Sequence, residues 1–171
     1  MLADVSSCEE MVEMVKQAPI GCVVELGVYQ GGSAKYLHDV CKETGRQLYL
    51  YDTFEGIPFK THLDEHEVGD FKDTSVDFVR ALCPEAIVVQ GVFPFSVQHM
   101  PPIAFAHIDA DQYDSIRMAL FVLGPMMVQG GVMWFDDVGC LDGADKALEE
   151  WVRATGNIPE RGKSGKYFVR F

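Results

Sequence analysis

Positive charge is scarce in this sequence. Its 171 residues include 14 lysines and arginines against 26 aspartates and glutamates, which gives a formal net charge of −12. Because like charges repel, this balance argues against nucleic-acid phosphates or an anionic membrane as the main partner. No apolar run approaches the roughly 18 residues that a membrane-spanning helix needs, and glutamates interrupt the beginning of the chain, where a secretory leader would be apolar. We therefore expect a cytoplasmic protein.

Paired cysteines are also absent. The five cysteines are odd in number and scattered, and none belongs to a Cys-x-x-Cys pair. This pattern argues against a disulfide framework and favours small buried side chains in a reducing compartment. A hydrophobic content of 48% is ample for a core, and the length suits one domain, which we take to span residues 1–171.

Two common nucleotide-binding signatures are missing from the first glycine turn. The turn reads "ELGVYQGGSA" from Glu25 to Ala34, with the spacing G-x-x-x-G-G instead of the G-x-G-x-x-G of dinucleotide enzymes. No Lys-Ser/Thr pair follows the glycines, so the turn is not a P-loop. A nucleotide-linked dehydrogenase and a nucleoside triphosphatase are both disfavoured.

An alternation of strands and helices is present instead. Apolar runs predict strands at 21–27, 46–52, 86–93, 103–109, 130–137 and 166–171, with a further short strand near 157–161. Helical periodicity predicts five helices between them; Ser6 and Ser7, three residues before Glu9 and Glu10, suggest a capping box for the first, and Asp73 a cap for the third. Nearly continuous apolar strands that alternate with helices predict an α/β fold with a parallel sheet covered on both faces.

Acidic residues stand at the ends of four of the predicted strands. In parallel sheets ligands bind beyond the carboxyl ends of the strands, and clustered carboxylates repel one another unless something binds them. An acid at the first strand end repels pyrophosphate and welcomes a cation, whereas an acid at the second is placed to accept hydrogen bonds from ribose hydroxyls. A cationic nucleoside without phosphates, such as S-adenosylmethionine, satisfies both conditions. These acids are Glu25, Asp52, Asp109, Asp136 and Asp137.

Four stretches together resemble class I S-adenosylmethionine-dependent methyltransferases and, more narrowly, the macrocin O-methyltransferase family. They are "ELGVYQGGSA", "YDTFEGIP", "HIDADQYDS" and "GGVMWFDDVG", in the expected order between residues 25 and 139. The resemblance implies a Rossmann-like, mostly parallel twisted sheet of about seven strands, the last one antiparallel. It also implies methylation of a hydroxyl on a sugar or another small diol-bearing acceptor.

Roles for individual residues follow from the same resemblance. Asp109, Asp136 and Asp137 would hold a divalent metal, Mg²⁺, and three carboxylates on adjacent strand ends also suit a hard cation on chemical grounds. The alternative is that Asp109 and Asp136 only cap helices while Asp137 faces solvent. The implied cofactor-binding residues are Glu25, Gly27, Val28, Gly31, Gly32, Ser33, Asp52, Thr53, Phe54, Gly91, Val92, Phe93 and Asp109.

The four motifs do not identify the general base that would take the proton from the acceptor hydroxyl. Related metal-dependent catechol methyltransferases place a lysine three residues after the first metal-binding acid, where this chain has Gln112, which cannot take a proton. The catalytic candidates are Asp109, His107 and Asp111. For His107 the alternative is a satisfied core histidine, and for Asp111 it is a helix cap.

Two further histidines, His62 and His66, lie in the long aperiodic stretch 53–71. A loop of this length is usually functional or mobile, so these side chains either close over a substrate as base candidates or belong to a solvated loop.

The sequence also departs from the family. Members usually have more structure before the first strand, so we expect an acceptor pocket that is more open or that a second subunit completes, as in a homo-oligomer. A module that binds the cofactor without transferring methyl groups is the alternative function. A nucleic-acid methyltransferase is disfavoured, because "DADQY" stands where its Asn/Asp-Pro-Pro-aromatic motif would be.

Overall fold

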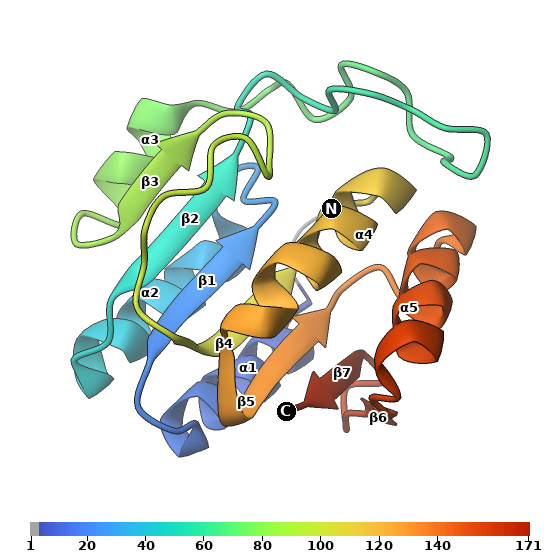
Figure 1. Cartoon of the computed structure of the whole chain (residues 1–171). Helices are drawn as coiled ribbons and strands as arrows, with labels where there is room; N and C mark the ends of the chain where they lie inside the picture. The colour runs from blue at the N-terminus through green and yellow to red at the C-terminus, as the bar shows by residue number, and fades with distance from the viewer. Residues whose placement is uncertain (1–3) are drawn as a thin grey trace.

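Seven strands form one sheet in the computed structural model, which describes residues 4–171 (Figure 1). The strands are β1 (Cys22–Leu26), β2 (Leu48–Asp52), β3 (Ile87–Gln90), β4 (Ile103–Ile108), β5 (Met127–Phe135), β6 (Pro159–Arg161) and β7 (Tyr167–Arg170). Their order is β3-β2-β1-β4-β5-β7-β6. The first five pair in parallel, and β7 pairs antiparallel with both β5 and β6. The predicted mostly parallel sheet with an antiparallel last strand is confirmed.

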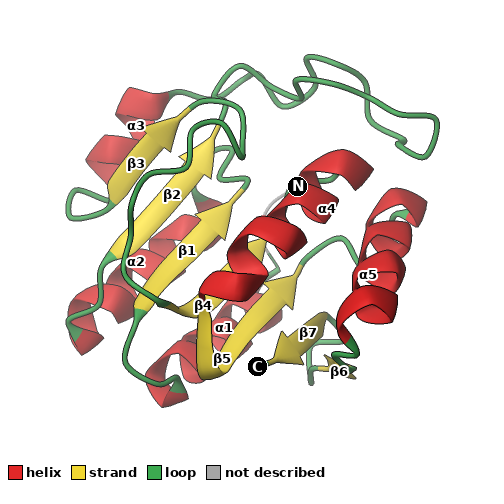
Figure 2. Ribbon diagram, in the orientation of Figure 1, coloured by secondary structure: helices red, strands yellow, loops and turns green. Residues whose placement is uncertain are grey.

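Helices cover both faces of the sheet (Figure 2). One apolar layer joins the sheet to α1 (Val5–Gln17), α2 (Gly32–Thr44) and α3 (Val76–Leu82). The other joins it to α4 (Tyr113–Leu123), the short 3₁₀ turn η1 (Gly124–Met126) and α5 (Asp142–Thr155). Within residues 4–171, no helix combines the length and apolarity that crossing a bilayer requires.

The two central strands are buried along their whole length, β1 as CVVEL and β4 as IAFAHI. Glu25 is in register with His107, and His107 with Trp134. Neighbours in register point to the same face of a sheet, here the face covered by α1 and α2, where Trp134 belongs to the apolar layer. The fold therefore places a carboxylate and an imidazole side by side inside an otherwise apolar layer.

The ends of several elements differ from the sequence prediction. The side chain of Asp4, not Ser6 or Ser7, caps α1 by accepting hydrogen bonds from two backbone N–H groups. Ser75 caps α3 in place of Asp73, because the Asp73 carboxylate accepts a hydrogen bond from the Tyr29 hydroxyl at 2.8 Å instead.

Two strands and one cysteine also need correction. β3 ends at Gln90, since Gly91 turns the chain with φ +141°, and β5 begins at Met127, where it pairs with Ile103. Four of the five free cysteines are buried as predicted, but Cys140 is exposed.

The hairpin between β6 and β7 is fastened to α1 by one carboxylate. Glu10 accepts hydrogen bonds from the backbone N–H groups of Lys163 at 2.8 Å and Ser164 at 2.7 Å. A Cβ atom at Gly162 would lie 2.9 Å from both Glu10 oxygens, so the turn passes too close for a side chain there. Segments more than 150 residues apart in the chain are thereby held together.

Glu10→Ala should lower the free energy of unfolding by about 2 kcal/mol, because two hydrogen bonds to a charged group are lost. Partial burial alone would raise the pKa of Glu10, but the N–H groups of Ser164 and Lys163 outweigh it and hold this pKa below its ordinary value of 4.5. The stabilisation is therefore complete above pH 4.5 and disappears as the pH falls through the lower, folded-state pKa. Urea unfolding at several pH values measures it.

Glu9→Ala is the matched control, since Glu9 is the exposed neighbour on the same helix. Equal destabilisation by the two variants at neutral pH would contradict the assigned role of Glu10.

Candidate active site

A cavity of about 480 Å³ lies at the carboxyl ends of the parallel strands. Its walls come from α1, the turn between β1 and α2, the loop after β2, the segment after β3 and the ends of β4 and β5. Of the residues named from the sequence, Glu25, Gly31 and Phe54 stay outside its wall. Those that line it are Gly27, Val28, Gly32, Ser33, Asp52, Thr53, Gly91, Val92, Phe93, His107, Asp109, Asp111, Asp136 and Asp137.

The glycine turn packs directly on the end of β4. A Cβ atom at Gly27, which has φ +84°, would lie 1.5 Å from the backbone oxygen of Asp109. Gly31, with φ +78°, precedes α2 and provides no side-chain cap for that helix. The turn therefore requires glycine at Gly27 for steric reasons, and it leaves the amino end of α2, at Gly32 and Ser33, lining the cavity.

Asp52 holds the two strand-end turns together. One carboxylate oxygen accepts hydrogen bonds from the N–H groups of Val28 at 2.7 Å and Tyr29 at 2.8 Å, and the other accepts one from Phe54 at 2.7 Å. Tyr29 and Phe54 both have positive φ, 48° and 55°, a conformation that costs energy in non-glycine residues. The predicted ribose contact remains a prediction, and the observed bonds give Asp52 the additional task of stabilising both turns.

Glu25 and His107 form a buried pair behind the glycine turn, with exposures of 0% and 1%. His107 Nδ1 lies 2.8 Å from Glu25 Oε1, and the Ser33 hydroxyl donates to the same oxygen at 2.5 Å. His107 Nε2 and Glu25 Oε2 have no hydrogen-bond partner among the described residues. His107 is thus fixed in orientation as a core histidine would be, and part of the residue lines the cavity.

Three carboxylates converge at the ends of β4 and β5. One oxygen from each of Asp109, Asp111 and Asp137 lies within 4.8 Å of the others. Burial and the neighbouring carboxylates raise the pKa of Asp109 well above its ordinary value. The same causes raise the pKa of Asp111 to about 6 and that of Asp137 to about 7. Among residues 4–171, no lysine or arginine forms an ion pair with these three carboxylates, and their all-oxygen composition fits a hard divalent ion.

Asp136, unlike these three carboxylates, forms an ion pair with a lysine. Lys166 Nζ lies 3.0 Å from Asp136 Oδ1 and donates to the backbone oxygen of Asp136 at 2.6 Å. Asp111 takes the third place in the carboxylate group, and its N–H donates to Asp137 at 2.9 Å. A metal role for Asp136 remains a prediction. The ion pair was missed because its lysine stands 30 positions further along the chain.

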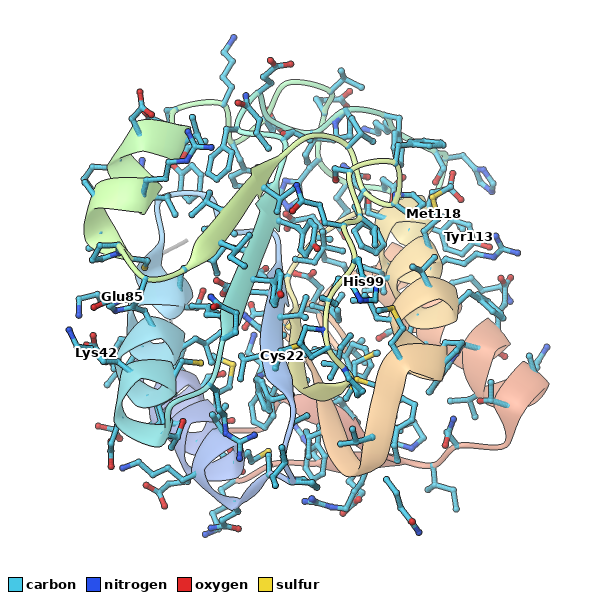
Figure 3. All side chains as sticks on the ribbon, turned by 60° about the vertical axis from the view of Figure 1, so that its left-hand side comes forward. Cys22, Lys42, Glu85, His99, Tyr113 and Met118 are labelled. Atoms are coloured by element: carbon cyan, nitrogen blue, oxygen red, sulfur yellow. The ribbon has the colours of Figure 1, made fainter. Side chains whose placement is uncertain are left out.

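Asp64, which is 8% exposed, attaches the loop after β2 to the beginning of α4. One of its oxygens accepts a hydrogen bond from the backbone N–H of Tyr113 at 2.6 Å, and the other accepts two from Thr61. Tyr113 is the first residue of α4 (Figure 3). Asp64 therefore supplies the helix cap that was one alternative for Asp111. A Cβ atom at Gly143 would lie 2.9 Å from Asp64, so α5 also approaches closely.

The pinned loop carries His66 to the carboxylate group. His66 Nε2 lies 3.6 Å from Asp111 Oδ1, and the His66 backbone oxygen accepts a hydrogen bond from the Gln112 side chain at 3.3 Å. Phe71 packs edge-on between His66 and Tyr29, with ring centroids 5.0 and 5.6 Å apart. His66 lines the cavity, whereas His62 is exposed and does not.

Comparison with known proteins decides the family. The family model described as macrocin-O-methyltransferase (TylF) matches residues 2–161. The chain belongs to the macrocin O-methyltransferase family. A curated relative from Streptomyces olivaceus, 8-demethyl-8-(2,3-dimethoxy-alpha-L-rhamnosyl)-tetracenomycin-C 4'-O-methyltransferase, is 26% identical over 151 residues. The match covers 77% of this chain and 58% of that protein, so the chain spans less than two thirds of the relative's length.

Solved structures establish the fold of this family member. The O-methyltransferase NovP has a TM-score of 0.80 at 18% identity, over 95% of this chain and 78% of that one. The calicheamicin methyltransferase CalS11 has a TM-score of 0.76 at 18% identity, over 97% and 77%. A Mg-SAM structure of cmcI-D160 has a TM-score of 0.61 at 17% identity, over 100% and 73%. The predicted Rossmann-like methyltransferase fold is confirmed.

Asp64→Ala should release the loop that it pins. Removing a helix-capping carboxylate costs about 1 kcal/mol, and the loop loses its contact with α4, so we expect faster tryptic cleavage at Lys60 and Lys72 with a small loss of global stability. Limited proteolysis followed by mass spectrometry measures the cleavage rates at each site.

Asp64→Asn should give an intermediate cleavage rate, because its one amide oxygen can accept from Tyr113 or from the Thr61 N–H but not from both. Glu65→Ala serves as the exposed control. Cleavage of Asp64→Ala at the wild-type rate would show that the loop is held in place by other contacts.

Proposed function

We propose that this chain is an S-adenosylmethionine-dependent O-methyltransferase acting on a hydroxyl of a sugar or another small diol-bearing acceptor, with residues 1–171 as one methyltransferase domain. The observation that carries the proposal is the cavity itself. It combines a backbone turn too tight for side chains at Gly27 with one lysine and the carboxylates at and just after the strand ends, which are Asp52, Asp109, Asp111, Asp136 and Asp137. Such a lining attracts a cationic nucleoside and repels a phosphorylated one.

The cofactor would lie along the glycine turn and the ends of β2 and β3. The backbone from Gly27 to Gly32 would approach its amino-acid end, the Asp52 region its ribose, and Gly91, Val92 and Phe93 its adenine. All of these segments line the cavity. The bound cofactor supplies an electrophilic methyl group, and the chain's task is to hold an acceptor hydroxyl in line with it.

A divalent cation would be held by Asp109, Asp111 and Asp137, the set that the geometry favours over one containing Asp136. Mg²⁺ bound there would lower the pKa of a coordinated hydroxyl. His66 faces the same group, and Gln112 supports His66 without being able to take a proton. His66 thus joins Asp109, His107 and Asp111 as a candidate for contact with the acceptor.

The curated relative is by its name a rhamnosyl 4'-O-methyltransferase, which supports a sugar as the acceptor class. The alternative, a module that binds the cofactor but does not transfer methyl groups, is favoured by glutamine at position 112. We also propose small-molecule acceptors in preference to nucleic acids, and a homo-oligomer in which a second copy borders the acceptor side of the cavity.

Titration calorimetry with S-adenosylhomocysteine and an assay of methyl transfer to sugars with vicinal hydroxyls test the proposal. We expect cofactor binding with or without Mg²⁺, and turnover that EDTA abolishes and Mg²⁺ restores. Binding without turnover on any diol would favour the binding module. Absence of binding would overturn the methyltransferase proposal.

Asp137→Asn tests metal binding independently of cofactor binding. At pH 8 in EDTA this variant relieves repulsion among three carboxylates, while its side-chain oxygen can still accept the Asp111 N–H. We expect its melting temperature to rise by about 2–4 °C, the shift that about 1 kcal/mol produces in a domain of this size. Added Mg²⁺ should stabilise the wild type and not the variant.

Asp142→Asn, at the exposed beginning of α5, is the control and should keep the Mg²⁺ response. A full Mg²⁺ response in Asp137→Asn would rule out the proposed ligand set.

A further inference from the structure

The side of the cavity bordered by α1 gathers hydrogen-bond donors beside one carboxylate, Asp4, whereas the other aspartates of the wall lie at and after the ends of β2, β4 and β5. Lys166, Ser7 and the amino end of α2 at Gly32 and Ser33 all line it. The amino end of a helix carries partial positive charge from its unpaired N–H groups, and α2 has 13 residues with no side-chain cap. An ammonium, a hydroxyl and a helix amino end together make a receptor for a carboxylate.

Lys166, directly before β7, reaches the cavity because of how the C-terminal hairpin packs. Glu10 fastens the hairpin turn before Lys166 to α1. The Lys166 side chain is 20% exposed. The ammonium makes two contacts, with the carboxylate and the backbone oxygen of Asp136. An ammonium has three N–H donors, so one remains for a ligand.

Ser7 provides an independent indication of a ligand. It is 2% exposed, and its hydroxyl has no hydrogen-bond partner among the described residues. A buried hydroxyl without a partner is disfavoured, and Ser7 lines the cavity. His107 is in the same situation, with a buried Nε2 that has no partner.

Carboxylates that could accept hydrogen bonds line the same cavity as these donors. Asp109 and Asp136 line the same cavity, and Glu25 has one unpaired oxygen behind the turn. A simple anion such as phosphate would be repelled by these acids, whereas a zwitterion presents a negative group to the donors and a positive group to the acids. The α-amino-acid end of a ligand has this chemistry.

We propose that Lys166, together with Ser7 and the amino end of α2, binds the α-carboxylate of the cofactor's amino-acid end. The proposal rests on the proposed function, since it assigns one end of the same ligand. Lys166 then connects Asp136 to the ligand carboxylate, and the C-terminal hairpin becomes part of the cofactor site. Lys166 is a binding residue in this assignment and takes no part in methyl transfer.

Two ligands separate this carboxylate contact from the rest of the site. S-adenosylhomocysteine and 5'-methylthioadenosine share the adenosine and the thioether, but only the first has an amino-acid end. We expect Lys166→Met to weaken S-adenosylhomocysteine by about 10- to 100-fold, the effect of losing a hydrogen bond from a charged group. The Kd of 5'-methylthioadenosine should stay within about twofold of wild type, measured by titration calorimetry.

Lys163→Met, from the same hairpin turn, is the matched control and should change neither affinity. Lys166→Arg should restore most of the affinity, since it keeps a cationic donor. Ser7→Ala gives a second test that leaves the ion pair intact, and should weaken S-adenosylhomocysteine alone by about fivefold, the effect of a neutral hydrogen bond.

Equal weakening of both ligands by Lys166→Met would overturn the proposal, because the lysine would then act only through Asp136 and the fold. Equal wild-type affinity for the two ligands would also overturn it. Failure of the wild type to bind either ligand would instead contradict the proposed function itself, so the two failures are distinguishable.

Discussion

Repulsion among carboxylates at one edge of the sheet is the constraint on which the site depends. Parallel strands bring the acids at their carboxyl ends together, and the chain binds three of them with its own groups. Backbone N–H groups bind Asp52, Ser33 and His107 bind Glu25, and Lys166 binds Asp136. Asp109, Asp111 and Asp137 lie together with no lysine or arginine of the described residues paired to them, and burial together with mutual repulsion raises the pKa of each carboxyl. The site is therefore prepared for a positive ligand before any ligand arrives.

What could be predicted from the sequence was mostly local. Each strand is an apolar run, and a parallel arrangement puts every strand-end acid at the same edge, so the sheet and the acidic cleft followed from pattern alone. The contacts that give individual acids their tasks join distant segments: Lys166 reaches Asp136, and Asp64 reaches the beginning of α4. No periodicity marks such a pair. The predicted cap of α3 failed for a related reason, because Asp73 bonds to the distant Tyr29. The cap of α1 was misplaced locally, since Asp4 accepts hydrogen bonds from the N–H groups of the two serines that were predicted as caps.

The aperiodic stretch after β2 is ordered by contacts within itself, such as two backbone hydrogen bonds between Ile57 and residues 69–70, and by contacts with other elements. It has no regular hydrogen-bond ladder, yet Asp64 ties it to α4, Gln112 holds the His66 backbone, and Phe71 packs on Tyr29 of the glycine turn. These contacts join the loop to both the carboxylate group and the turn. A segment fixed by a few polar contacts opens at lower free energy than the sheet beneath it, so this loop is a part of the cavity wall that opens more easily than the strands.

Lys166 also connects the two ends of the cavity. Its ammonium neutralises Asp136, and this explains why the carboxylate group contains Asp111 instead. A ligand carboxylate that draws on the same ammonium weakens its hold on Asp136, which increases the negative charge felt at the neighbouring Asp109 and Asp137. A cation at those residues then gains affinity, and by reciprocity it strengthens the binding of the carboxylate ligand by the same factor. With the proposed cofactor and metal in place, a single lysine on the C-terminal hairpin would make their two binding sites interdependent through charge balance, with no movement of the sheet required.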